Sequence, residues 1–372
     1  MKKICHITTV HTRYDVRIFH KECKSLAKKY NVYLIVADGL KDETVENVKI
    51  TDIGLRQASR LKRAKIDSKK ALKKALELDC DLYHFHDPEL IPIGVKLKKL
   101  GKQVIFDIHE NTDLQILEKE WIPFVFRRIL SKTYSLYEKY HINKFDMLII
   151  PQNAMLEKFS KINKTAVIGN FPNRKINNNT DLKDSYNKFK LLYAGSINEA
   201  RGLFNMLNLI KELKSINKEY SLTIAGSIED SMLEKVKQYP EWEFVNYLGF
   251  ISKEKIEAEY KKHTIGLIMF NNVGQYFMAY SLKLFEYMQN GMTIIMPNFG
   301  DWIAFNNTYK AGYNIDVHDS KATAKLIDSF TDDIFVNFKI INKTTVNTDF
   351  SWESQEKKLF KIYTDILDNL QN

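Results

Sequence analysis

The stretch FKLLYAGSINEARGLFNMLNLIKELKSINKEYSLTIAGS (189–227) shows the two patterns from which the rest of the chain is built. An apolar run ends at Gly195, a helical pattern follows over 203–216, and a second apolar run ends at Gly226. Runs that are apolar on both faces are typical of parallel strands covered by helices on either side. The stretch therefore predicts a strand–helix–strand unit of a parallel sheet.

The same alternation recurs along nearly the whole chain. A first series of apolar runs predicts strands at 4–10, 32–37, 48–53, 82–87, 103–109, 147–151 and 165–170. A second series predicts strands at 189–196, 220–227, 245–251, 265–270, 292–297 and 311–317. Helical patterns lie at 20–30, 61–77, 89–100, 203–216, 254–262, 281–290 and 352–370. The polar segment NRKINNNTDLKDSYN (173–187) separates the two series, and 372 residues suit two domains. We expect an α/β fold of two doubly wound parallel sheets that face a cleft.

Composition narrows the cellular setting more than the function. The formal net charge of +10 suits nucleic acid, anionic lipid or phosphorylated small molecules, and lysines that only solvate helix surfaces account for it equally well. Three scattered cysteines do not make a disulfide framework, which indicates a reducing compartment. No segment has the pattern of a signal peptide or the length of an apolar transmembrane helix. We expect a cytoplasmic protein, or one on the inner face of the plasma membrane.

Polar residues follow two neighbouring strands of the first predicted sheet, where ligands of such sheets bind. One strand ends with His84 and His86 beside Asp87, and the next ends with Asp107 and His109. A single histidine at such a place is usually satisfied by a backbone group, but two strand ends of this kind indicate a functional rim. A metal held by His84 and His86 with His109 or Asp107 stays open, although the spacing does not require one.

The second predicted domain offers groups for an anionic ligand. Gly195 lets the backbone approach a ligand, and Arg201 follows with a guanidinium suited to a diphosphate. Ser281 is the predicted N-cap of a helix whose free N–H groups, helped by Lys283, form an anion site. Glu286 lies one turn further along, where it either accepts hydrogen bonds from ribose hydroxyls or faces solvent.

Several segments, in order along the chain, resemble the retaining GT-B glycosyltransferases of family 4, particularly bacterial members that build surface polysaccharides. The matching segments are DVRIFHKE (15–22), HDPEL (86–90), FDIHE (106–110), NFPN (170–173), AG to RG (194–202), KLFEYM (283–288) and FSWE (350–353). Each segment alone is weak evidence for the family, while the whole set in this order is specific to it. The resemblance implies an acceptor-side domain at 1–172, a nucleotide-sugar-binding domain at 173–350, and a helix at 351–372 that crosses back to the first domain.

The resemblance also implies roles for three catalytic residues. His109 would be the rim histidine that touches the transferred sugar. Arg201 would be the basic residue that binds the diphosphate, and Glu286 would bind the ribose. The implied reaction stabilises the leaving nucleoside diphosphate by preplaced cations and amides. It uses no metal and no cofactor besides the nucleotide-sugar donor.

The donor phosphates would be held, by the same resemblance, near Gly195 and at the helix start formed by Ser281, Leu282 and Lys283. One departure concerns a glutamate that the family often has seven residues before the ribose-binding one. Met278 stands at that position here. This departure keeps a catalytically weak scaffold or binding protein open as an alternative.

The implied function is transfer of a hexose from a nucleotide sugar to a lipid-linked or polysaccharide acceptor, in lipopolysaccharide or capsule synthesis. A sugar-nucleotide epimerase of the same fold is the nearest enzymatic alternative. Nucleic-acid binding rests on net charge alone, since no base-reading helix or aromatic strand motif is present, and we do not expect it.

The pattern over 118–144 predicts one long helix with both aromatic and basic residues. Such a helix either lies on anionic membrane headgroups or is a core helix with a solvated basic side. Its aromatic residues are Trp121, Phe124, Phe126, Tyr134, Tyr137 and Tyr140, and its basic residues include Arg127, Arg128, Lys132, Lys139 and Lys144.

Overall fold

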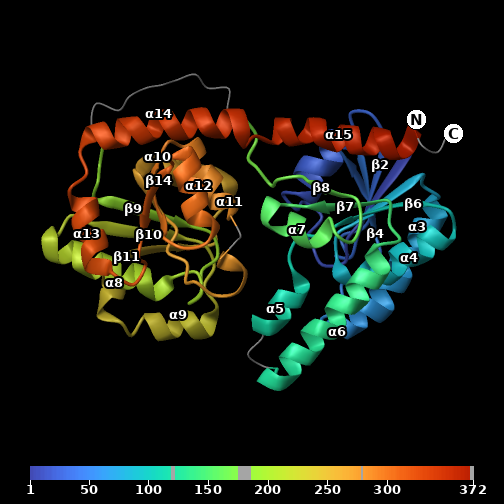
Figure 1. Ribbon diagram of the computed structural model, residues 1–372, viewed down its shortest axis with the longest axis horizontal. Coiled ribbons are helices and arrows are strands. Elements are labelled where there is room, and N and C mark those ends of the chain that lie inside the picture. The colour runs from blue at the N-terminus through green and yellow to red at the C-terminus, as the bar shows by residue number, and fades with distance from the viewer. Residues whose placement is uncertain (119–121, 175–185, 278–279, 369–372) are drawn as a thin grey trace. The chain divides into compact units, whose positions relative to one another are not determined.

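The computed structural model of the protein describes residues 1–118, 122–174, 186–277 and 280–368. The chain divides into two units: the first is Met1–Asn170 with Trp352–Asn372, and the second is Phe171–Ser351. Each unit contains a sheet with helices on both of its faces (Figure 1). The fold is thus the α/β arrangement of two doubly wound sheets that the alternating patterns predict.

The first unit has an eight-stranded sheet in the order β3-β4-β2-β1-β5-β6-β7-β8. Every strand pair in it is parallel except β3 with β4. The hairpin strand β3 is the one strand of this sheet that the sequence patterns missed, because three residues with two polar side chains give no apolar run. The strands are β1 (Lys3–Ile7), β2 (Asn31–Val36), β3 (Glu43–Val45), β4 (Val48–Asp52), β5 (Leu82–Phe85), β6 (Gln103–Asp107), β7 (Met147–Ile150) and β8 (Thr165–Val167).

Short and irregular helices connect these strands. Two of them, η1 and η2, are π-helical turns. The helices are η1 (Ile18–Cys23), α1 (Lys24–Leu26), α2 (Arg60–Lys62), η2 (Arg63–Asp67), α3 (Ser68–Leu78), η3 (Pro88–Leu90), α4 (Ile91–Lys99), α5 (Thr112–Glu118), α6 (Phe124–Ile142), η4 (Asn153–Met155), α7 (Leu156–Phe159) and α15 (Trp352–Asp368).

The prediction of a single helix over 118–144 is wrong. Helix α5 ends at Glu118, and α6 begins at Phe124 directly after Pro123. Pro123 has an extended backbone and no N–H to continue a helix, so the chain breaks there. Trp121 lies outside the described residues.

Helix α15 belongs to the core of the first unit. Trp352, Leu359 and Tyr363 are buried in one cluster with β1, β2 and η1 side chains. The indole N–H of Trp352 donates to Oγ of Ser25 at 2.9 Å. The last helix therefore completes one face of the first sheet.

The second unit has a six-stranded, fully parallel sheet in the order β11-β10-β9-β12-β13-β14. Its strands are β9 (Lys190–Ala194), β10 (Ser221–Ala225), β11 (Val245–Gly249), β12 (Ile265–Leu267), β13 (Thr293–Pro297) and β14 (Gly312–Ile315). Its helices are α8 (Leu203–Ile216), α9 (Asp230–Val236), η5 (Pro240–Phe244), α10 (Lys253–Lys262), η6 (Gly274–Phe277), α11 (Leu282–Gln289), α12 (Asp301–Tyr309), α13 (Ser320–Asp328) and α14 (Asp332–Asp349).

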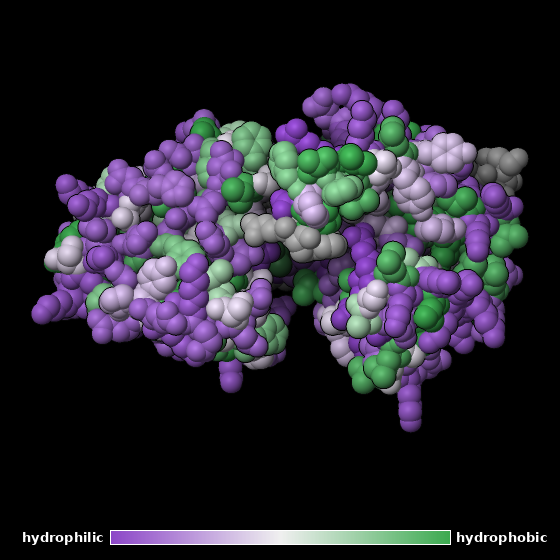
Figure 2. Space-filling view, turned by 90° about the horizontal axis from the view of Figure 1, so that it is seen from below, coloured by the Kyte–Doolittle hydropathy of each residue, from purple (hydrophilic) through white to green (hydrophobic). Residues whose placement is uncertain are grey.

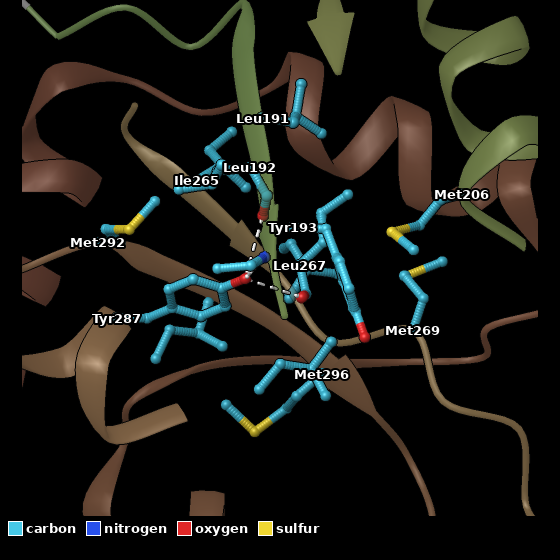
Figure 3. Close-up of a cluster of buried hydrophobic side chains, with 14 of the residues drawn as sticks. Leu191, Leu192, Tyr193, Met206, Ile265, Leu267, Met269, Tyr287, Met292 and Met296 are labelled. Carbon is cyan, nitrogen blue, oxygen red and sulfur yellow. Dashed lines mark hydrogen bonds between the residues drawn. The ribbon is translucent and has the colours of Figure 1, made fainter. Parts of the chain in front are cut away.

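Tyr287 attaches α11 to this sheet from inside the core (Figure 3). Its hydroxyl accepts the N–H of Ala194 at 2.9 Å and lies 3.3 Å from the carbonyl oxygen of Leu192 and 3.4 Å from that of Leu267. A side chain at Gly266 would clash with this ring, since its Cβ would lie 2.5 Å from Cδ2 of Tyr287. The core thus fixes α11 against the carboxyl ends of β9 and β12.

Candidate functional site

The first group of candidate residues lies where β9 ends, beside α11. Gly195 follows β9 with φ of +113°, a conformation that favours glycine. Gly226 follows β10 and packs so closely that a Cβ there would lie 1.9 Å from the carbonyl oxygen of Gly195. Two glycines in contact therefore leave backbone without side chains at the carboxyl ends of β9 and β10. Ligands of such folds bind at the carboxyl ends of the strands.

Lys283 lies under this backbone, with 6% of its surface exposed. Its Nζ donates to the hydroxyl of Tyr193 at 2.7 Å and lies 3.9 Å from the centroid of that ring and 4.9 Å from that of Phe270. A Cβ on Gly195 would be 3.5 Å from Nζ. The amine therefore lies next to the Gly195 turn.

The charges of Arg201 and Glu286 both act on the amine of Lys283. Burial lowers the pKa of Lys283 well below its usual value, the charge of Arg201 adds to this, and that of Glu286 opposes it. The structure therefore brings together the three charged residues that the sequence selected in this unit.

Arg201 is held over the loop after β9. Its Nε donates to the hydroxyl of Tyr276 at 3.0 Å, and its NH1 donates to the carbonyl oxygen and Oγ of Ser196 at 2.9 and 2.6 Å. A guanidinium fixed in this way is oriented before an anion arrives.

Glu286 is not a freely solvated helix residue. It is half-buried, and its Oε2 accepts a hydrogen bond from the hydroxyl of Tyr260 at 2.9 Å. Burial and the charge of Glu286 raise the pKa of Tyr260 above its usual value, so Tyr260 stays a donor. This contact fixes the carboxylate while leaving acceptor capacity on it.

The start of α11 has the predicted residues but not the predicted cap. Ser281 occupies the N-cap position with an extended backbone, and its hydroxyl makes no capping hydrogen bond within the described part of the chain. Leu282 is the first helical residue and is half-buried. The first-turn N–H groups of α11 therefore lack the side-chain acceptor that a cap supplies. Met278 lies outside the described residues.

The second group of candidate residues belongs to the first unit and centres on Asp107, the last residue of β6. Arg17 binds both of its carboxylate oxygens, with Nε donating to Oδ2 at 2.7 Å and NH2 to Oδ1 at 2.9 Å. The predicted rim residue His109 contacts the same Oδ2 through Nε2 at 3.1 Å. Burial alone would raise the pKa of Asp107, but Arg17 and the hydrogen bond from His109 outweigh it and hold the pKa well below the usual range.

A chain of buried side chains continues inward from Asp107. Nδ1 of His86 lies 3.3 Å from Oδ2 of Asp107, and Nε2 of His86 lies 3.0 Å from Nδ1 of His6. Nε2 of His6 is 3.1 Å from the hydroxyl of Tyr363, which is 2.6 Å from Nδ1 of His84. His84 and His86 are therefore fully buried members of a network, not rim residues, and only His109 keeps its predicted place.

Two groups of these side chains lie close enough to share a cation. They are His6, Glu22, His84 and His86, and the set His86, Asp107 and His109. In the first set, Nε2 of His84 and both oxygens of Glu22 have no hydrogen-bond partner among the described residues. The other nitrogens of the first set already bond to side chains of this group, and Oε1 of Glu22 forms an ion pair with Nε of Arg17 at 3.2 Å. The expectation of no metal stays a prediction.

Sequence reasoning missed several residues of this group, namely Arg17, His6, Glu22 and Tyr363, and also His11 beside it. Arg17 gave a signal, since a buried arginine inside an apolar helical segment requires a carboxylate partner. His11 lies in the loop after β1, and its ring centroid is 4.7 Å from that of His109. Burial opposes its charged form, but Asp15 and Asp87 outweigh this and raise the pKa of His11. A second histidine, with a raised pKa, therefore lies beside the candidate rim histidine.

Comparisons with known proteins concern the fold and the family of the chain. Residues 175–342 match the family model of glycosyl transferases, group 1. Sucrose-phosphate synthase from Thermosynechococcus elongatus is similar in structure over 99% of this chain and 100% of its own, with a TM-score of 0.78 and 15% identity. The chain has the GT-B fold.

Two further structures show the same fold. One is HepE from Anabaena in complex with UDP and glucose, similar over 98% of this chain and 100% of that chain, with a TM-score of 0.71 and 12% identity. The other is a glycosyltransferase from Rickettsia africae, similar over 99% of both chains, with a TM-score of 0.69 and 14% identity. A comparison with curated protein sequences gave no significant match. The group 1 match and the GT-B fold together support a glycosyltransferase.

Proposed function

We propose that the chain is a retaining hexosyltransferase of family 4 that moves a sugar from a nucleoside diphosphate to a lipid-linked or polysaccharide acceptor of the cell surface. The lipopolysaccharide and capsule are the acceptor classes that the sequence resemblance suggests. The observation that carries the proposal is the cluster of Arg201, Lys283 and Glu286 beside the bare backbone of Gly195, within the group 1 domain.

The charge of this cluster suits a leaving nucleoside diphosphate. Negative charge grows on the β-phosphate as the sugar departs, and fixed cations and amide donors favour that transition state. Arg201, Lys283 and the first-turn N–H groups of α11 supply these groups, and Glu286 supplies an acceptor for ribose hydroxyls. The proposed reaction therefore uses no metal ion and no cofactor. Retention follows if the acceptor attacks on the face from which the phosphate leaves, with a phosphate oxygen taking the acceptor proton.

The donor is proposed to be a uridine diphosphate sugar as the first choice to test. HepE, which shares the fold, has been solved with UDP and glucose. A thermal-shift screen of nucleotide sugars identifies the donor, which should raise the melting temperature of the wild type.

Substitution of the charged cluster tests the proposed site. Arg201→Ala and Glu286→Ala should each lower kcat/KM for transfer by about 10²-fold or more, as loss of one preorganised group commonly does. Both variants should keep the wild-type circular dichroism spectrum. Lys218→Ala and Glu234→Ala, which change exposed residues of the same unit, serve as matched controls.

Three outcomes would contradict the proposal. Wild-type turnover in both site variants would show that the cluster is not the donor site. Conversion of the donor without any acceptor would indicate an epimerase instead. Lack of calorimetric affinity for every nucleoside diphosphate would indicate a scaffold or binding protein.

The acceptor is proposed to lie at an anionic membrane that α6 contacts. Helix α6 exposes a series of large apolar side chains, with Phe124 and Tyr140 each 63% exposed. Val125, Ile129, Leu136 and Tyr140 are spaced by four and seven residues, which places them on one side of the helix. Figure 2 shows hydrophobic and hydrophilic residues side by side over this unit. None of the described helices combines the length and apolarity needed to span a bilayer.

Cations lie next to these apolar side chains. Arg128 lies over the ring of Phe124 at 4.7 Å, and Lys144 lies over that of Tyr140 at 3.9 Å. Apolar and aromatic groups flanked by cations match the chemistry of an anionic lipid surface.

Sedimentation with vesicles tests the membrane contact. The protein should sediment with phosphatidylglycerol vesicles at low salt and much less with phosphatidylcholine vesicles. Phe126→Ser with Ile129→Ser should weaken the binding, whereas Leu40→Ser, at an exposed leucine elsewhere in the same unit, should not. No sedimentation with anionic vesicles at low salt would contradict the proposed contact.

A further inference from the structure

Asp107 sets the direction of every hydrogen bond in the buried chain of the first unit. Its carboxylate is bound by the Arg17 guanidinium on both oxygens, and an ionised carboxylate can only accept. The nitrogens that approach Oδ2 must therefore carry protons. These are Nδ1 of His86 at 3.3 Å and Nε2 of His109 at 3.1 Å.

The rest of the chain follows one step at a time. Since Nδ1 of His86 donates, its Nε2 accepts from Nδ1 of His6 at 3.0 Å. Nε2 of His6 then accepts from the hydroxyl of Tyr363 at 3.1 Å, and the oxygen of Tyr363 accepts from Nδ1 of His84 at 2.6 Å. The last atom of the chain is Nε2 of His84, which carries no proton in this assignment. It has no hydrogen-bond partner among the described residues. In this set of proton positions, Nδ1 of His86 and Nε2 of His109, which lie 3.3 Å apart, are two donors that share Oδ2 of Asp107.

The outer end of this chain is His109, with 20% of its side chain exposed. Its Nε2 is committed to Asp107, so Nδ1 is the nitrogen that remains for a ligand. No hydrogen bond to Nδ1 occurs within the described ranges of the chain. The ring of His11 lies 4.7 Å from that of His109.

We propose that Asp107, anchored by Arg17, is a positioning residue that holds His109 with its proton on Nε2, so that Nδ1 accepts a hydrogen bond from a sugar hydroxyl. The inference deepens the proposed function and rests on it for the identity of the ligand. It predicts that His109 acts as an acceptor and that a ligand offering only acceptor atoms there binds poorly. The same hydrogen-bond directions continue into the core through His86, His6 and Tyr363, the last of which lies in α15.

Nuclear magnetic resonance of the full chain labelled with ¹⁵N-histidine tests the proton position directly. Each nitrogen of a neutral imidazole resonates in a distinct range according to whether it carries a proton. The signals of His109 are identified by their loss in His109→Gln. In the wild type without ligand, Nε2 of His109 should be protonated and Nδ1 should not. A proton on Nδ1, with or without one on Nε2, overturns the proposal.

Asp107→Asn tests the cause of this proton position. The amide nitrogen is a donor, so the variant should lose the preference for a proton on Nε2. If the proposed function holds, kcat should fall by about 10- to 10²-fold, the scale of one lost hydrogen bond. KM for the donor should change much less. Should Asp107→Asn fail to fold, Arg17→Lys keeps the charge but removes the second contact to Asp107, and the wild-type spectrum still decides.

The readouts separate this inference from the proposed function. UDP affinity, which belongs to the second unit, should be unchanged in Asp107→Asn. If the wild type shows no transfer but has the proton on Nε2, the proposed function fails and the proton position stands. Metal analysis of the purified wild type adds one more outcome: a stoichiometric ion bound through His86 or Asp107 would overturn the assigned hydrogen-bond directions.

Discussion

Lys283 is the residue of the candidate site whose charge depends most on what binds beside it. Its amine is buried against Tyr193 and Phe270, and the charge of Arg201 acts on it. Both burial and Arg201 disfavour the ammonium form. A diphosphate at Gly195 would reverse this balance, because an anion favours the charged lysine.

Binding of a nucleoside diphosphate should therefore take up a proton from solution. The free protein has a lowered Lys283 pKa, and the complex has a higher one, so uptake occurs at pH values between the two. Titration calorimetry in two buffers of different ionisation enthalpy measures it as a difference in observed enthalpy. Lys283→Met should abolish the difference, and equal enthalpies in both buffers for the wild type would contradict the expectation.

Helix α11 carries Ser281, Lys283 and Glu286, so its attachment to the sheet determines where all three lie. The buried hydroxyl of Tyr287 holds that helix to β9 and β12 (Figure 3). The sequence showed the helix and its charged residues, but nothing in it singled out Tyr287 from other apolar positions.

Tyr287→Phe should lower the free energy of unfolding by about 1–3 kcal/mol, because the N–H of Ala194 is left buried without its acceptor. Urea denaturation measures this. Tyr239→Phe, at a tyrosine that is 40% exposed, is the matched control and should change stability little. A loss no greater than that of the control would show that the hydroxyl does not hold α11.

How much the sequence predicted differs between elements for physical reasons. Of the fourteen strands in the described residues, thirteen were visible in the sequence because buried parallel strands are continuous apolar runs. The short strand β3 is not such a run. Pro123 was present in the sequence, yet the aromatic and basic pattern on both sides of it hid the helix break. The pair of Arg17 and Asp107 was beyond reach, since 90 residues separate them and only the strand order brings them together. The candidate residues of the second unit were easier to predict from the sequence than this pair, because they lie directly after one strand and near the start of one helix.

Three fully buried histidines make the stability of the whole molecule sensitive to acid. Burial lowers the pKa of His86 to about 4 and lowers those of His6 and His84 well below 6.5. A histidine of this kind contributes stability that is fully present above its unfolded pKa and is lost as pH falls toward the folded value. Glu22 acts in the opposite sense, because burial raises its pKa and the folded state keeps its proton.

The free energy of unfolding should therefore fall between pH 7 and pH 5. Near pH 5 the three histidines favour proton binding by the unfolded chain, and Glu22 offsets part of this. Each proton corresponds to roughly 1.4 kcal/mol per pH unit. Urea denaturation at the two pH values measures the slope, and His84→Gln should reduce it by about one proton. Equal stability at both pH values would contradict the expectation.

The place of α15 in the core of the first unit has a consequence for synthesis. Trp352, Leu359 and Tyr363 leave the ribosome after every strand of both sheets. The second unit has all its strands and helices before them and can fold while translation continues. The first unit, although begun earliest, must wait with one face of its sheet uncovered until the final helix is released. A chaperone that binds nascent apolar surface should therefore stay on this chain until translation of residues 352–368 is finished.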